Sequence, residues 1–288
     1  MSEILVMGAT GTVGSGVVDI LAEQGADFAA AVRDDESEAR LRDLGVDTVR
    51  ADYSDPDSLL AAMHGVAHVF LILPLDQSMM DWGRNAIAAA KEAEVKCVVR
   101  SSVLGADANA HFRLGRAHGV MDQTLDESGL PFVVLRPNTF MQNYVRYLGP
   151  AIRETGLLPL AEQDGATSFI DARDVAAAVA AVLLEPDRHL GRIYTLTGPE
   201  ALDNTAVAEI IAKAAGRDVR YQKVEIEEAG LALESLGMPE WNVHMVLSMT
   251  RYVKAGYAAF TTKAVEHLTG RPARTFEQFA EDFADAWK

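Results

Sequence analysis

Gly8-Ala9-Thr10-Gly11-Thr12-Val13-Gly14 is the stretch that decides the fold, because it joins a short apolar run to a segment with helical spacing. Residues 4–7 (ILVM) predict a strand, and residues 13–22 predict a helix. Three glycines at this spacing allow a tight turn, a close approach of backbone N–H groups to phosphate, and close packing of helix on strand. The helix N-terminus adds partial positive charge. A dinucleotide site is therefore expected here, although spaced glycines also mark ordinary turns.

The same alternation continues through the first half of the chain. Uninterrupted apolar strands that alternate with amphipathic helices predict a parallel sheet covered on both faces. The expected strands are residues 4–7, 28–32, 48–50, 68–73, 97–101 and 132–136, and the expected helices are residues 13–22, 37–44, 58–63, 79–93 and 119–125. We therefore predict an α/β protein whose residues 1–150 form a Rossmann-type, doubly wound parallel sheet that binds a dinucleotide.

The pattern loosens after Pro137, where glycines and prolines mark a stretch rich in loops. Further strands are expected at residues 168–170, 193–196 and 220–224, and helices at residues 175–184, 205–215, 242–254, 262–268 and 276–287. Residues 151–288 are expected to form a smaller substrate-binding lobe, interleaved with the first domain. We expect it over the carboxyl ends of the strands, where ligands of open α/β sheets bind.

Charge and composition exclude several classes of function. A net charge of −16 over 288 residues argues against nucleic acid or an anionic membrane as a partner, because an acidic surface repels phosphate. The single cysteine, Cys97, rules out an internal disulfide, and no Cys/His cluster has zinc-ligand spacing, so no metal is expected. No signal peptide or long apolar stretch is visible. We expect a cytoplasmic protein with a small-molecule substrate, and a homodimer is left open.

Arg33 bears on the choice of cofactor, because it follows the second expected strand. An acidic residue there bonds the adenosine ribose 2′-hydroxyl of NAD, whereas an arginine accommodates the 2′-phosphate of NADP. A guanidinium makes charge-assisted hydrogen bonds to phosphate. This predicts NADP(H). The alternative is a solvated arginine held by Asp34 and Asp35.

Two further positions fall where a dinucleotide would lie. Asp52 follows the third strand and could accept a hydrogen bond from the adenine amino group, or it could be a turn residue in Asp52-Tyr53-Ser54-Asp55. Leu73 and Pro74 end the fourth strand. The proline is expected to leave the sheet there, and the same position faces the cofactor in this topology.

An ordered set of motifs extends over nearly the whole chain: residues 8–14 (GATGTVG), 32–34 (VRD), 101–103 (SSV), 128–132 (SGLPF), 135–143 (LRPNTFMQN), 169–175 (FIDARDV) and 268–272 (LTGRP). This set resembles the NmrA-like atypical short-chain dehydrogenases. That group includes quinone and dye reductases, reductases similar to festuclavine dehydrogenase, and catalytically silent redox sensors. Together with the positions above, the resemblance implies these cofactor contacts: Gly8, Thr10, Gly11, Thr12, Val13, Gly14, Arg33, Asp52, Leu73, Pro74 and Ser101.

The proton donor is not the one that ordinary short-chain dehydrogenases use. None of the seven tyrosines has a lysine four residues later, so the Tyr-x-x-x-Lys pair is absent. His118 matches the position where isoflavone-reductase-like relatives carry a lysine, and histidine can donate a proton near neutral pH. We predict a catalytic His118, which would give the pH–rate profile a limb near neutrality. The alternative is a histidine that packs within an amphipathic helix.

Residues after the sixth strand are candidates for the substrate pocket. Aromatic and thioether side chains suit a flat apolar acceptor, and amides can orient it, but the same residues could pack the smaller lobe. The candidates are His111, Asn138, Phe140, Met141 and Asn143. The leading hypothesis is an NADPH-dependent oxidoreductase that transfers hydride to a quinone, enone or imine. Its rivals are a non-catalytic NADP(H)-sensing regulator and an isomerase or epimerase with a bound cofactor.

Overall fold

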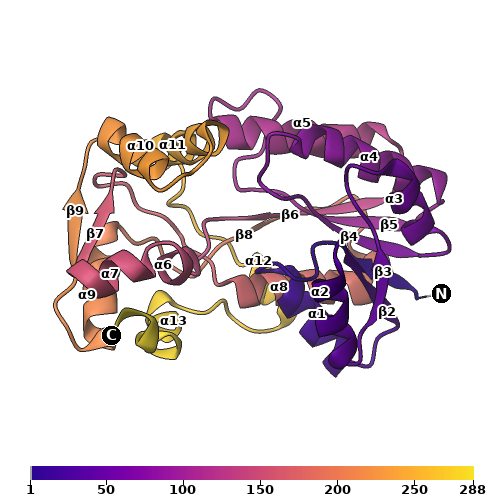
Figure 1. The fold of residues 1–288 in the computed structure, drawn as a ribbon, viewed down its shortest axis with the longest axis horizontal. Coiled ribbons are helices and arrows are strands. Elements are labelled where there is room, and N and C mark those ends of the chain that lie inside the picture. Colours follow the sequence, from indigo (N-terminus) through magenta and orange to yellow (C-terminus); the bar gives the residue numbers. More distant parts are fainter. Residues whose placement is uncertain (1) are drawn as a thin grey trace. The chain divides into compact units, whose positions relative to one another are not determined.

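Seven strands, all at positions expected from the sequence, form one sheet. They are β1 (Ile4–Val6), β2 (Phe28–Val32), β3 (Asp47–Arg50), β4 (His68–Ile72), β5 (Cys97–Ser101), β6 (Phe132–Pro137) and β8 (Ile193–Leu196). The computed structural model describes residues 2–288 and gives the order β3-β2-β1-β4-β5-β6-β8 (Figure 1). Every neighbouring pair from β3 to β6 is parallel. The predicted doubly wound α/β fold is confirmed.

Helices lie on both faces of this sheet. They are α1 (Gly14–Glu23), α2 (Asp35–Asp43), α3 (Pro56–Met63), α4 (Met79–Glu92), α5 (Arg113–Glu127) and α8 (Ala172–Leu184). Figure 1 shows α3, α4 and α5 on one face and α1 and α8 on the other. The start of α3 shows why a helix begins at this point of the sequence. The Asp55 carboxylate accepts the Ser58 N–H at 3.2 Å, and Pro56 occupies the first turn.

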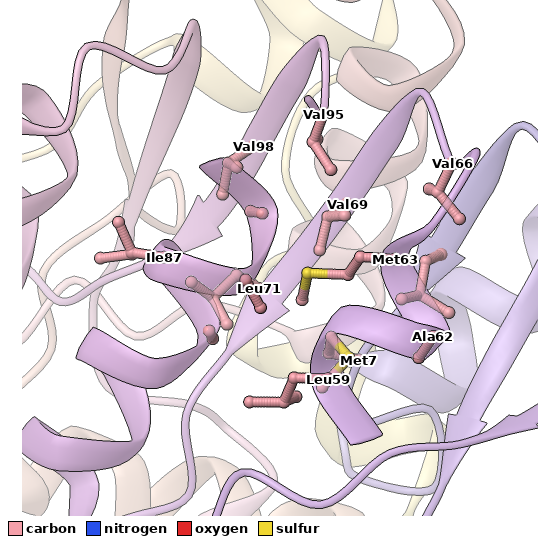
Figure 2. Close-up of a cluster of buried hydrophobic side chains, with 14 of the residues drawn as sticks. Met7, Leu59, Ala62, Met63, Val66, Val69, Leu71, Ile87, Val95 and Val98 are labelled. Carbon is pink, nitrogen blue, oxygen red and sulfur yellow. The ribbon is translucent and has the colours of Figure 1, made fainter. Parts of the chain in front are cut away.

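An apolar cluster between α3, α4 and the central strands holds the sheet in place. Figure 2 shows Leu59 and Met63 of α3 gathered with Met7, Val69 and Leu71 from the strands and the segment after β1. All five are at most 2% exposed. Burial of each such side chain contributes about 1.5–3 kcal/mol to stability. The loops at the carboxyl ends of the strands are therefore anchored on a rigid base.

The chain divides into two compact units. Unit 1 contains the residues up to Ala110, Gly115–Arg136 and Val175–Tyr194, and unit 2 contains His111–Leu114, Pro137–Asp174 and Thr195–Lys288. This division does not fall at the 150/151 boundary that the sequence suggested. Most of α8 and the start of β8 belong to unit 1 again. Just before β8, the Arg192 carbonyl accepts the Val134 N–H of β6 at 3.0 Å.

Unit 2 contains a two-stranded parallel sheet and an aromatic core. Its elements are α6 (Asn143–Arg146), α7 (Gly149–Thr155), β7 (Leu157–Leu160), α9 (Asn204–Ala215), β9 (Arg220–Lys223), α10 (Ile226–Ser235), α11 (Glu240–Lys254), α12 (Ala264–Thr269) and α13 (Phe276–Asp282). Tyr144, Phe169 and Phe276 meet edge to face, with ring centroids 5.2–5.8 Å apart. The indole of Trp287 donates to the Tyr144 carbonyl at 2.8 Å, which ties the last residues into this core.

Some elements differ from those expected. Helix α5 begins at Arg113, well before the expected start at residue 119. The expected start was too late because the two glycines of this helix resemble loop residues in the sequence. Gly119 has a packing reason instead: a Cβ there would lie 2.1 Å from the Asp107 carbonyl carbon. Residues 168–170 form only an isolated bridge, from Ile170 to Phe140. Strand β7 and helices α6, α7 and α10 were not expected.

Candidate cofactor and active site

Gly8 and Gly14 are required by the backbone of the turn after β1. Gly8 has φ of +64°, and a Cβ there would lie 2.7 Å from Ile72 Cγ2. A Cβ at Gly14 would lie 2.1 Å from the Gly8 carbonyl oxygen. Only glycine fits at these two positions, because the first turn of α1 rests directly on the loop.

Gly11 has a different reason to be glycine. It is exposed, and a Cβ there would meet only the Gly8 carbonyl oxygen, at 3.3 Å. Apart from this one tight contact the position is open, and the glycine keeps the space outside the turn free. Val13 at the N-cap of α1 makes no side-chain cap, and the first turn of the helix carries no acidic residue. An open cradle beside an uncapped helix N-terminus fits the pyrophosphate of a dinucleotide.

The other predicted contacts in this turn differ in what they can offer a ligand. Thr10 is exposed and Thr12 is half-buried. Val13 is only 1% exposed, so its backbone alone can face a ligand.

Arg33 lies exposed directly after β2, and no hydrogen bond or ion pair of its side chain is present among residues 2–288. The Asp34 carboxylate instead caps α2 by accepting the Ser37 N–H at 2.8 Å, and this bond lowers the pKa of Asp34. Asp35 pairs with Arg50. The two acidic neighbours are thus occupied elsewhere, and the Arg33 guanidinium is left for a ligand.

Arg50 shapes this corner and was not among the predicted site residues. From the end of β3 its guanidinium donates to the Arg33 carbonyl at 2.8 Å and to Glu38 at 2.9 Å. It thereby ties the turn that carries Arg33 to α2. An arginine that ends a strand beside an acidic helix start is the signal that could have identified it.

Asp52 forms a turn of its own. One carboxylate oxygen accepts the Ser54 hydroxyl at 2.7 Å and the Ser54 N–H at 2.8 Å, and these bonds lower the pKa of Asp52. Arg33 contributes to the same lowering, so the two side chains share one neighbourhood. The structure thus shows the turn, and the contact with adenine stays a prediction.

The carboxyl ends of β4 and β5 meet the glycine turn. Ile72 pairs in register with Ser101, and Ile72 also lies against Gly8. Leu73 is half-buried and Pro74 is exposed, while Ser101 is 4% exposed. The predicted cofactor positions from β1, β4 and β5 are therefore brought to one edge of the sheet, as ligand sites in this fold require.

A buried charge network lies behind this edge. Arg100 in β5 is 0% exposed and pairs with Asp122 of α5. The second oxygen of Asp122 accepts Arg136 Nη2 at 2.8 Å, Arg136 Nε at 3.0 Å and the Ser102 hydroxyl at 3.0 Å. Two guanidiniums share one carboxylate. The sequence signal was an arginine inside an otherwise apolar strand, because a fully buried charge needs a partner.

His118 adjoins this network. It is half-buried on α5, and its Nδ1 lies 3.4 Å from Arg100 Nη2. Burial, and then the Arg100 charge, hold the pKa of His118 well below its ordinary value. A pH–rate limb from this group therefore belongs on the acid side, not near neutrality as the sequence suggested. Whether His118 takes part in the reaction stays a prediction.

Asn138 and Met141, predicted to contact substrate, are engaged within unit 2. The Asn138 amide donates to the Ser168 hydroxyl at 2.8 Å and to the Ala258 carbonyl at 2.9 Å, and accepts the Thr139 N–H at 2.8 Å. Met141 is 1% exposed among apolar neighbours. These contacts match the packing alternative for both residues.

The other three candidates are more accessible. His111 is exposed just before α5, Phe140 is half-buried and bridges to Ile170, and Asn143 is half-buried at the start of α6. All lie in unit 2. Their contact with substrate stays a prediction.

A separate cavity of about 440 Å³ lies in unit 1, lined by Glu3, Asp27, His68 and residues 183–188 among others. Its residues come from the amino ends of β1 and β4, opposite the glycine turn, so it is distinct from the cofactor edge. Within residues 2–288 no group of three or more His, Cys, Asp or Glu is placed to hold a metal ion. In the same described part of the chain, every helix is too short or too polar to cross a membrane.

Comparison with known proteins gives full-length matches. The NmrA-like family matches residues 1–281. The NAD(P)H azoreductase of Xenophilus azovorans is 39% identical over 284 residues, covering 99% of each chain. The NADPH-dependent quinone oxidoreductase of Escherichia coli, solved with NADPH, superposes with a TM-score of 0.89 at 29% identity, over 97% of this chain and 99% of that one. Citrobacter sp. triphenylmethane reductase with NADP(H) gives 0.87 at 25% identity, over 98% and 99%.

Proposed function

The chain belongs to the NmrA-like family and is an NAD(P)H-dependent oxidoreductase, and we propose that it transfers hydride from NADPH to a small, flat, electrophilic acceptor such as a quinone, enone or imine. The bound nicotinamide supplies the hydride. The protein binds, orients and shields the reactants. The observation that carries the proposal is the open glycine cradle with the unengaged Arg33 beside it.

Arg33 supports NADPH over NADH. Its guanidinium is exposed at the end of β2, and its acidic neighbours are engaged with α2 and Arg50. The carboxylate next to Arg33 is already engaged, because Asp34 caps α2 by accepting the Ser37 N–H. A guanidinium is well suited to a 2′-phosphate, since it can donate two parallel hydrogen bonds.

The names of the similar proteins support a conjugated acceptor. Azo compounds, quinones and triphenylmethane dyes are conjugated molecules that can accept hydride into an extended π-system. Such an acceptor spreads the charge that arrives with the hydride, so it has less need of a strong acid. This agrees with a chain in which the Tyr-x-x-x-Lys pair is absent. We propose that His118 faces the acceptor.

The competing proposal, a non-catalytic NADP(H) sensor, has less support. Curated proteins 30–39% identical over nearly the whole chain are named as reductases or oxidoreductases. The isomerase alternative is disfavoured by the missing tyrosine.

A panel assay with C4-deuterated NADPH tests the function. Purified protein is incubated with representative quinones, enones, imines and azo compounds, and cofactor oxidation is followed together with deuterium in the product. We expect turnover and deuterium transfer for at least one flat acceptor. NADPH that binds but is oxidised by none of the panel, at rates above a protein-free control, would contradict the proposal.

A further inference from the structure

Arg100 belongs to a cluster of charged side chains that holds more positive charge than negative. Its Nη1 pairs with Asp122, whose carboxylate also serves Arg136, and its Nε is buried without a hydrogen-bond partner among residues 2–288. Two cations and one anion leave the cluster with one net positive charge. In a low-dielectric interior, a further positive charge beside it is strongly disfavoured.

The contact between Arg100 and His118 determines which imidazole nitrogen carries hydrogen. A guanidinium has only donors, so the Nδ1 of His118, 3.4 Å from Arg100 Nη2, must be the acceptor. An accepting Nδ1 carries no hydrogen. The hydrogen of the neutral ring is then on Nε2.

We propose that Arg100 holds His118 as a neutral imidazole with its hydrogen on Nε2, so that His118 serves the reaction as a hydrogen-bond donor and not as an acid. The groups that face His118 are Arg100 of β5, with Asp122 of α5 and Arg136 of β6 behind it. Burial and the Arg100 charge also lower the pKa of the imidazole, in the same direction.

The chemical consequence rests on the proposed function. Hydride delivered to the acceptor leaves negative charge on its oxygen or nitrogen. The Nε2–H of His118 would hydrogen-bond that atom, and the Arg100 charge on the far side of the ring would polarise the N–H and strengthen the bond. The proton that completes the product comes from water, and His118 is neutral before and after. Arg100 and Asp122 are therefore positioning residues.

Nitrogen NMR of His118 in the free protein tests the inference without any substrate. Long-range ¹H–¹⁵N correlation spectra distinguish a hydrogen-bearing ring nitrogen from a bare one, and His118→Gln assigns the signals among the seven histidines. We expect a bare Nδ1, a hydrogen on Nε2, and protonation only at a pH well below the ordinary histidine value. A hydrogen on Nδ1, or protonation near neutrality, would overturn it.

Substitution of Arg100 tests the cause. Arg100→Gln leaves Asp122 paired with Arg136 and Ser102, so no buried charge is stranded. We expect the His118 pKa to rise and the preference for a hydrogen on Nε2 to weaken. We also expect kcat to fall about tenfold, which corresponds to about 1.36 kcal/mol, with little change in KM. Arg100→Lys should restore much of the effect on the His118 pKa and much of the lost kcat. Ser102→Ala, which removes a hydrogen bond to Asp122 but no charge, is the matched control and should leave the His118 spectrum unchanged.

The outcomes separate this inference from the proposed function. Unchanged His118 signals in a folded Arg100→Gln protein would refute the role of Arg100 whatever the enzyme reduces. If Arg100→Gln fails to fold, the wild-type spectrum alone still decides the tautomer. A correct tautomer in a protein that reduces nothing would contradict the function and leave the state of His118 established.

Discussion

Arg33 is the residue on which we propose that cofactor choice depends, because its guanidinium is exposed and makes no hydrogen bond or ion pair with residues 2–288. Arg33→Ala should weaken NADPH binding by about 1.5–3 kcal/mol, the range for hydrogen bonds to charged groups. NADH binding should barely change, since NADH has no 2′-phosphate. Calorimetric titration with both cofactors measures the difference. Arg40→Ala, an exposed arginine on the neighbouring α2, is the control. Equal losses for both cofactors would show that Arg33 supports the turn.

His118 is the residue whose proposed chemistry differs most from the expectation drawn from the sequence. If His118 is a neutral donor, His118→Phe removes the donated N–H and should lower kcat by roughly 10²–10³-fold, the range for loss of one donor to a developing charge. His118→Gln retains an N–H and should lose less. NADPH affinity should stay within a few-fold in both, and neither variant should remove a pH–rate limb near neutrality. Equal losses of kcat in His118→Phe and His118→Gln, together with the loss of a pH–rate limb near neutrality, would instead indicate that His118 acts as an acid.

At the scale of elements, the glycine turn and α1 act as one unit. Gly11→Val should abolish NADPH binding in a folded protein, because its side chain meets little of the protein and would occupy the open side of the turn. Gly14→Val should lower stability itself, because its Cβ would collide with the Gly8 carbonyl. Thermal unfolding and NADPH titration separate the two effects. A Gly11→Val protein that binds NADPH normally would remove the turn from the site.

Elements were predictable where one physical constraint dominated. Strand β2 has the expected bounds, because a strand buried on both faces is apolar throughout, and β5 has them because its first three residues are apolar. Helix α10 and strand β7 were missed, since their half-exposed sequences carry no such signal. The site followed the same rule. Glycine positions are dictated by local backbone geometry, whereas the partnership of Arg100 with Asp122, 22 residues away, depends on how β5 and α5 pack.

At the scale of the whole molecule, the net charge of −16 makes pH a general influence on stability, and Glu162 adds a specific one. Burial raises the pKa of this unit 2 carboxyl, whose oxygens accept long hydrogen bonds, 3.4 Å each, from Asn204 and Thr250. Above the ordinary glutamate value the unfolded chain loses this proton while the folded chain keeps it. The free energy of unfolding therefore falls as pH rises, until the folded carboxyl also ionises.

Glu162→Gln keeps the shape of the side chain but removes the titration. Relative to the wild type, the variant should gain stability between about pH 5 and about pH 8, because the unfavourable ionisation of the folded carboxyl is removed. Urea unfolding at the two pH values measures this gain. Glu154→Gln removes the same charge from the exposed face of α7 and corrects for the overall acidity of the chain. A gain equal to that of Glu154→Gln would mean that the pH dependence comes from net charge and not from the buried Glu162.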